Sequence, residues 1–266
     1  ARSMAQLTHP NVLKVYEVGK KNGQFYIAME FIEGENLSQW QKTRDWKSCL
    51  ETYIKAGRGL AEVHKAGMTH RDFKPANVLV GDNGRICVAD FGLVRIRSEG
   101  QKTNAAKPAF KSDITDKTIE GSLVGTPAYM SPEQLRGELA TPLSDQFSFC
   151  ASLYEALFEE RPFNGHDVQT LLTLIEAGPD ISSDLPKWLT TALKRGLSFV
   201  PGARFKDMGK LLKALSPPVT LGLARVSLAL GTGVIVVIVA TLVAGLLSKT
   251  SPPPDSAPPP FESRDL

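Results

Sequence analysis

Charge of either sign is nearly balanced in this chain, and no run of five or six like charges interrupts it. The sequence has 31 Lys and Arg against 28 Asp and Glu, which leaves a formal net charge of only +3 over 266 residues. Proteins that bind nucleic acid usually carry a basic stripe or patch. The charge pattern therefore predicts no nucleic-acid partner, and a phosphate-bearing ligand has to be argued from local residues.

Cysteine is also scarce. The three cysteines, Cys49, Cys87 and Cys150, lie far apart and form no CxxC or Cys/His spacing. This pattern argues against a disulfide framework and a structural zinc site, and it favours a reducing compartment. The first residue is Ala1 rather than Met, and the residues after it form a polar helical pattern rather than a signal peptide. We therefore expect the sequence to begin partway through a domain.

The first 216 residues are typical of the α+β class, in which strands come first and helices follow. The β-branched and aromatic runs at 12–19 and 24–32 predict one hairpin, and the apolar runs NVLV and RICVAD, joined by GDNG, predict another. Apolar residues at three- and four-residue spacing predict a long helix over 46–67 that ends at Gly67. Further helices are expected near 132–137, 143–159, 167–177, 186–197 and 205–214.

Residues 226–247 form an apolar run of 22 positions without a charge. About 20 such residues in a helix cross a bilayer core, so the run predicts a single transmembrane helix. A buried core helix is the alternative, but the six prolines within 248–266 indicate an extended tail that supplies no core. Four Lys or Arg lie within about 20 residues before the span and two after it, which favours a cytoplasmic location for the preceding domain and places the tail outside.

Three motifs follow one another along the chain: HRDFKPANVLV at 70–80, VADFGLVR at 88–95 and GTPAYMSPEQ at 125–134. A lone His-x-Asp is usually only a turn, but three motifs in this order are far more specific. The trio resembles the signature of eukaryotic-type protein kinases. The stretch AGRGLAEVHKAGMTHRDFKPANVLVG also resembles bacterial members of that family.

The resemblance extends from residue 1 to about residue 215 and implies a protein-kinase-like fold. Residues 1–32 would then be a remnant of the small N-terminal lobe, and 33–216 the mostly helical C-terminal lobe. Residues 217–225 would form a juxtamembrane segment before the helix at 226–247, and 248–266 a proline-rich tail.

The same resemblance implies a role for each motif residue. Asp72 would accept the proton of the attacking hydroxyl, and Lys74 would neutralise charge on the γ-phosphate of ATP. Asn77 and Asp90 would coordinate Mg²⁺ through oxygen atoms. Thr126 would lie near Asp72, and the combination of Lys74 with Thr126 resembles kinases that phosphorylate Ser and Thr of protein substrates.

A nucleotide site and a linking spine are implied as well. Met29 falls at the position that limits the depth of the adenine pocket, the backbone of Glu30 and Ile32 would bond the adenine edge, and Leu79 would form its floor. The spine between the lobes would consist of Met4, Val15, His70 and Phe91.

Three polar residues have expected supporting roles. Asp145 would hold the backbone of the catalytic loop, and Glu133 would pair with Arg204. A helix cap for Asp145 and a surface charge for Arg204 are the plainer interpretations, and both stay open at this stage.

Regulation is implied by Arg71, which directly precedes the catalytic aspartate and would dock a phosphate of the long polar loop at 95–124. The candidate phosphorylation sites in that loop are Thr115, Thr118 and Ser122. Each of them can equally be an ordinary solvated loop residue.

The sequence contains no glycine-rich phosphate loop, no strand lysine and no partner glutamate upstream of these motifs, all of which a complete kinase has. We therefore expect the 266 residues alone to be inactive or nearly so, and the parent protein to be an active kinase. Two alternatives remain: a membrane-tethered pseudokinase that acts as a scaffold, and a gene remnant whose open sheet edge promotes aggregation. Homodimerisation through the apolar helix also stays open.

Overall fold

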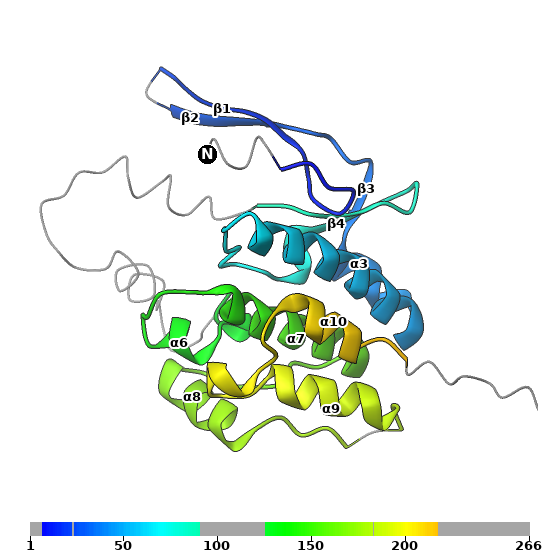
Figure 1. Ribbon diagram of the computed structural model, residues 1–266, viewed down its shortest axis with the longest axis vertical. Coiled ribbons are helices and arrows are strands. Elements are labelled where there is room, and N and C mark those ends of the chain that lie inside the picture. Colours follow the sequence, from blue (N-terminus) through cyan, green and yellow to red (C-terminus); the bar gives the residue numbers. More distant parts are fainter. Residues whose placement is uncertain (1–6, 23, 91–125, 183, 218–266) are drawn as a thin grey trace, which may run out of the picture. The chain divides into compact units, whose positions relative to one another are not determined.

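The structure, a computed structural model, describes residues 7–22, 24–90, 126–182 and 184–217 (Figure 1). The chain divides into two units, Ala1–Pro218 and Val219–Leu266, and the second lies outside the described residues. The apolar run 226–247 and the tail therefore lie outside them too. Within the described ranges, no helix combines the length and the apolar character that a bilayer crossing requires.

The first sheet is the expected hairpin of β1 (Val15–Lys21) and β2 (Gln24–Met29), which pair antiparallel. Both strands are shorter than predicted. The residues before β1 turn away from the hairpin, so that Leu13 N donates to Val88 O at 2.9 Å and Val12 forms a parallel bridge to Val88. The segment ahead of β1 thus satisfies its backbone groups on a different strand.

The second sheet has the order β3-β4-β5, with β3 at Gly34–Asn36, β4 at Val78–Gly81 and β5 at Ile86–Val88. The β4–β5 hairpin agrees with the sequence prediction, but β3 was not predicted because Gly-Glu-Asn has little β-propensity. A glycine is required at its start, since Gly34 has φ +147° and a Cβ there would lie 2.2 Å from Val80 O. This strand leads into α2 (Leu37–Trp40) and a 3₁₀ turn at Gln41–Thr43.

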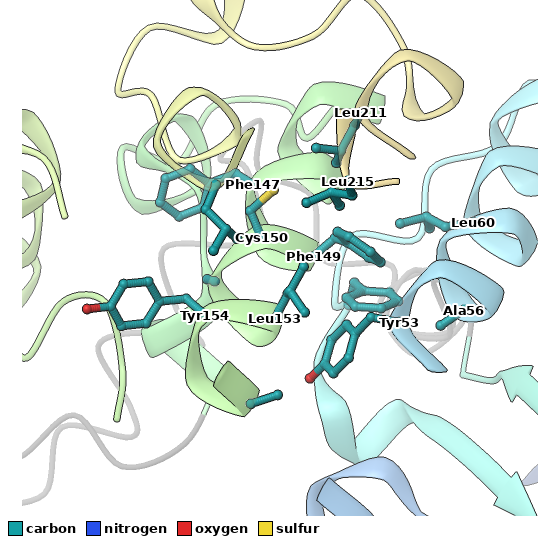
Figure 2. Packing of buried hydrophobic residues seen from close by; sticks show 14 of the residues in the cluster. Tyr53, Ala56, Leu60, Phe147, Phe149, Cys150, Leu153, Tyr154, Leu211 and Leu215 are labelled. Carbon is teal, nitrogen blue, oxygen red and sulfur yellow. The ribbon is translucent and has the colours of Figure 1, made fainter. Parts of the chain in front are cut away.

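The core of the helical region lies between α3 (Trp46–Lys65) and α7 (Pro142–Phe158). Figure 2 shows Phe149 of α7 pointing toward Tyr53 and Leu60 of α3. The rings of Tyr53 and Phe149 meet edge-on at 5.8 Å, and Tyr53 Oη donates to Ser152 O at 2.8 Å. The hydroxyl of this buried tyrosine is thereby satisfied, so α3 and α7 are joined by packing and by a hydrogen bond.

Four further helices surround this core, and each overlaps a segment predicted to be helical. They begin after side-chain caps in three cases, since Ser131, Asp167 and Asp207 each accept a backbone N–H of the first turn. The helices are α6 (Pro132–Leu135), α8 (Val168–Ala177), α9 (Lys187–Gly196) and α10 (Met208–Ala214). Short 3₁₀ turns complete the chain at Pro75–Asn77, Thr126–Tyr129 and Pro201–Ala203.

Gly59 of α3 allows the segment before β1 to lie directly against the helix. A Cβ at Gly59 would be 2.1 Å from Asn11 O, a backbone atom that also accepts the N–H of Val88 at 3.0 Å. Asn11 Nδ2 donates to Ile86 O at 2.9 Å, so the contacted segment is fixed to β5 and cannot yield easily.

We expect Gly59→Ala to destabilise the protein. The overlap should cost about 1–3 kcal/mol, against a gain in helix propensity of about 1 kcal/mol for replacing glycine by alanine, and chemical denaturation in mild detergent would measure the net loss. Gly202→Ala is the matched control, because a Cβ there meets no atom within 4 Å. Equal stability of the two variants would contradict the close approach.

Candidate active site

The carboxylate of Asp145 organises the loop that carries the first motif. Asp145 lies in the first turn of α7 and is 1% exposed. Its two oxygens accept the backbone N–H of His70 at 2.7 Å and of Arg71 at 2.7 Å, and Oδ2 also lies 2.8 Å from His64 Nε2. A buried charge is tolerated only when it is this well hydrogen-bonded. Asp145 therefore has the expected contact with the loop backbone.

The loop itself is strained and held from several sides. Arg71 has φ 73°, an unfavourable conformation for a residue with a side chain. Two residues after Arg71, Phe73 is buried, with its ring 5.5 Å from that of Phe149 and 5.7 Å from that of His70. The α7 helix thus fixes the loop through a carboxylate and through an aromatic contact.

His70 connects this loop to the second motif. Its Nε2 lies 2.9 Å from Ala89 O, and its Nδ1 accepts the N–H of Asp72 at 3.3 Å. These contacts fit a neutral ring with the proton on Nε2. Burial lowers the pKa of His70 and outweighs the opposing effects of Asp145 and the Ala89 carbonyl. The buried ring therefore links the catalytic loop to Ala89 through hydrogen bonds.

Asp72, the expected catalytic base, has one engaged and one available oxygen. Its Oδ2 accepts Lys74 Nζ at 2.8 Å and Asn77 Nδ2 at 3.1 Å. Its Oδ1 is buried and has no hydrogen-bond partner among the residues that the structure describes. A carboxylate oxygen that is desolvated and unpaired is costly unless it has a use. Oδ1 is therefore the carboxylate oxygen that is not engaged by Lys74 or Asn77.

Asn77 and Asp90 supply oxygen atoms of the type that Mg²⁺ prefers. Asn77 Nδ2 donates to both Asp72 O at 2.8 Å and Asp72 Oδ2, so the remaining polar atom of this amide is its oxygen. Asn77 O accepts the N–H of Ala89 at 2.9 Å, which joins the loop to Asp90, an exposed residue with φ 58°. The described residues contain no group of three His, Cys, Asp or Glu that could hold a metal by themselves. One amide and one carboxylate suit an ion that shares its shell with phosphates and water.

The residues expected to contact adenine lie on an apolar cluster. Ile32 and Leu79 pack against the buried cluster of Leu13, Cys87 and Ala89. Met29 ends β2 with 39% of its surface exposed.

Glu30 connects this site to the β4–β5 turn. It forms an ion pair with Arg85, which also donates to Pro10 O at 3.1 Å. The hydrogen bond with Arg85 lowers the pKa of the Glu30 carboxyl. Arg85 thus fixes both the segment at Glu30 and the segment at Pro10 to the β4–β5 turn.

The third motif is attached to the rest of the site through two neighbouring residues of α6. Glu133 forms a two-armed ion pair with Arg204, at 2.8 and 3.0 Å, and both side chains are buried. Gln134 Nε2 donates to Arg71 O at 2.8 Å. Arg204 uses its remaining N–H groups on the carbonyls of Leu143, Ser198 and Phe199, so it is not a surface charge.

The other sequence-based site residues divide into two groups. Arg71 is exposed, and Thr126 begins the 3₁₀ turn Thr126–Tyr129. Val15 is buried at the start of β1. Met4, Phe91, Thr115, Thr118 and Ser122 lie outside the described residues.

Sequence reasoning missed two residues that support the site, His64 and Gln134. His64 sits on the apolar face of α3, where a histidine among leucines and alanines is a weak signal that it has a buried acceptor. Gln134 was detectable only as the third helical residue of a Ser-x-x-Gln capping box. That pattern predicts a helix start and does not indicate the bond to Arg71.

We expect Glu133→Gln to lower the free energy of unfolding by about 3–5 kcal/mol near neutral pH, because it leaves Arg204 as a buried unpaired charge. Burial raises the pKa of Glu133, but the hydrogen bond and charge of Arg204 lower it by more, so the net value is below the ordinary 4.5. The contribution is therefore present above about pH 4.5 and is lost as the pH falls through the lowered pKa. Denaturant unfolding of both proteins at pH 7 and in acid would show the difference shrinking.

Glu138→Gln is the control for this experiment. Glu138 pairs with Arg136 on the surface, where an ion pair contributes about 0–1 kcal/mol. A cost at Glu133 no larger than at Glu138 would contradict the structural role of the buried pair.

Comparison with known proteins finds several protein kinases that resemble this chain in sequence. The chain is 30% identical to the serine/threonine-protein kinase PknA of Mycobacterium tuberculosis over 226 residues, which cover 81% of this chain and 49% of that protein. It is 29% identical to a probable serine/threonine-protein kinase PknB of Lactococcus lactis, over 83% of this chain and 34% of the relative. It is 31% identical to the tyrosine-protein kinase MasK of Myxococcus xanthus, over 81% of this chain and 34% of the relative. The chain therefore spans about half the length of PknA and about a third of the other two.

The family match covers most of the described site. The model of the protein kinase domain matches residues 1–196, which include all three motifs and every expected catalytic and metal-binding residue. The chain belongs to the protein kinase family.

Proposed function

We propose that the protein to which these residues belong transfers the γ-phosphate of ATP to serine and threonine hydroxyls of other proteins. The observation that carries the proposal is the state of Asp72. One carboxylate oxygen is fixed by Lys74 and Asn77, while Oδ1 is buried and unpaired within the described part of the chain. A base has to stand within hydrogen-bond reach of the hydroxyl that it serves.

The steps follow from the positions of these side chains. A substrate hydroxyl would donate to Asp72 Oδ1, which orients its oxygen toward the γ-phosphorus and receives its proton as the new O–P bond forms, while the bond to the β–γ bridging oxygen breaks and ADP leaves. Lys74 Nζ would keep the carboxylate oriented and place a positive charge beside the transferred group. Asp145 acts only through the loop backbone, so we regard it as a positioning residue.

Asn77 and Asp90 would hold Mg²⁺ in this proposal. When bound, the ion neutralises phosphate charge and fixes the phosphates for displacement. The link from Asn77 O to the N–H of Ala89 keeps the amide and the carboxylate in register on adjacent segments. Ile32 and Leu79, on their apolar base, would receive the adenine.

The preference for Ser and Thr rests on the residue pattern. Lys74 two positions after Asp72, together with Thr126, is the pattern that favours these acceptors, and PknA and PknB are named serine/threonine kinases. MasK, at similar identity, is named a tyrosine kinase, so acceptor type has to be measured.

We also propose that the protein is anchored in the membrane by residues 226–247, with its kinase domain on the cytoplasmic side, where ATP and Mg²⁺ are available, and its tail outside. The 266 residues alone should transfer phosphate weakly or not at all, since they contain no glycine-rich loop, strand lysine or partner glutamate. Phosphorylation at Thr115, Thr118 or Ser122 would supply a partner for the exposed Arg71.

The test is transfer of radiolabelled phosphate from ATP–Mg²⁺ to a basic protein substrate, with the longer protein that includes the upstream kinase elements. Asp72→Asn should reduce the rate by at least about 10²–10⁴-fold, the usual contribution of a positioned base. Phosphoamino-acid analysis of the product should find phosphoserine and phosphothreonine.

Asp82→Asn is the control, because Asp82 is an exposed aspartate on the β4–β5 turn. It should leave the transfer rate unchanged. A folded protein that binds ATP but transfers nothing would contradict the enzyme and favour the scaffold. Phosphotyrosine as the main product would contradict the acceptor assignment alone.

A further inference from the structure

A basic hollow lies between α9 and α10, on residues that the catalytic site does not use. It is lined by Arg195, Phe205, Lys206, Lys210, Lys213 and Ala214. Lys210 and Lys213 lie about one turn apart on α10, and Lys206 comes two residues before that helix begins. Figure 1 shows α9 and α10 next to each other.

The three lysines have no acid to neutralise them among the residues that line the hollow. The nearest acid in the sequence, Asp207, accepts the N–H of Lys210 at 2.8 Å as the cap of α10 and is not part of the lining. All three lysine side chains are exposed. Three adjacent cations repel one another, so an anion placed over them would relieve an unfavourable interaction.

The other side chains of the hollow add one further cation and two apolar groups. Arg195 donates to Ala203 O and Arg204 O at 3.3 Å, and its guanidinium lies 4.4 Å from the ring centre of Phe205. These contacts fix the arginine side chain. Phe205 and Ala214 add apolar surface to the hollow. A hollow lined by exposed amines together with apolar groups suits the phosphate and glycerol of a lipid headgroup.

The position of the hollow along the chain selects the partner. Ala214 ends α10, and the eleven residues 215–225 separate it from the apolar run at 226–247. Such a connection reaches at most about 40 Å when fully extended. If that run crosses a bilayer, the lysines are held permanently near a surface of headgroups, which makes binding effectively intramolecular.

From these observations we propose that the basic hollow of α9 and α10 binds anionic lipid headgroups and so docks the kinase domain on the bilayer that anchors it. The proposal rests on the membrane anchoring proposed above. Each lysine close to an anionic surface should favour the docked state about fivefold. The attraction should be lost at high salt, where the screening length falls to about 3 Å.

The test is lysine footprinting of the full chain in lipid nanodiscs. The chain is placed in discs of phosphatidylcholine alone or of phosphatidylcholine with phosphatidylglycerol, treated briefly with acetic anhydride, and read by mass spectrometry. Labelling of Lys206, Lys210 and Lys213 should fall at least about fivefold in the anionic discs and recover in about 1 M salt. Lys20, Lys21 and Lys47, exposed residues of β1 and α3, serve as internal controls and should label equally in both discs.

Variants separate docking from unfolding and from a free-anion site. Replacing the three lysines by glutamine should abolish the difference in Arg195 labelling between neutral and anionic discs and leave the thermal transition unchanged. The same replacement at the three control lysines should leave that difference in Arg195 labelling intact. Arg195 is followed in both variants by dicarbonyl labelling. Equal labelling of the three lysines in neutral and anionic discs would overturn the proposal. Protection by soluble glycerol phosphate, with no effect of the anionic bilayer, would do the same.

A separate experiment, done first, tests whether the chain is anchored in the membrane at all. Flotation with neutral vesicles at high salt tests insertion of the apolar run without any contribution from the lysines. A chain that does not float contradicts the anchoring and with it this inference. A chain that floats but shows no lipid-dependent footprint contradicts the docking alone.

Discussion

One buried carboxylate, that of Asp145, holds the active site together. Without its oxygens, the N–H groups of His70 and Arg71 would lose their acceptor, that of His70 in a buried position, and the positive φ of Arg71 would lose the bond that stabilises it. Each unsatisfied group would cost about 1–3 kcal/mol, and the strained residue a similar amount. The position of the carboxylate is set by α7, which packs against α3 through Phe149 and Tyr53. Packing of two helices thus determines the path of a catalytic loop.

The rest of the site is attached to that loop by single, identifiable bonds. His70 reaches Ala89, Asn77 reaches Asp72, and Gln134 reaches the carbonyl of Arg71. The bonds of His70 and Gln134 join the loop to the second and third motifs, and the bond from Asn77 closes the loop on itself. Glu133, next to Gln134, anchors the third motif to Arg204 deep in the helical region. The three motifs, separate in the sequence, become one unit because the second and the third each form a bond to the first.

The sequence was informative wherever the signal was local. The periodicity of α3 and the turn residues between β4 and β5 predicted those elements, and the order of the motifs led to the family. The long-range partners Glu133–Arg204 and Asp145 with the loop came from the resemblance, since separations of about seventy residues leave no local pattern. β3 and the bonds of His64 and Gln134 were missed because tertiary context alone determines them. The apolar run and the phosphorylation sites lie outside the described residues and stay predictions.

The most direct measurement of the central claim is amide hydrogen exchange at His70 and Arg71, followed by NMR in the full chain and in Asp145→Asn. The account predicts slow exchange of both amides in the original protein, comparable to amides in the middle of α3. It also predicts a large loss of protection at these two positions in the variant, with α3 still protected. Fast exchange of His70 and Arg71 in the original protein, or unchanged protection in the variant, would contradict the claim that Asp145 holds the catalytic loop.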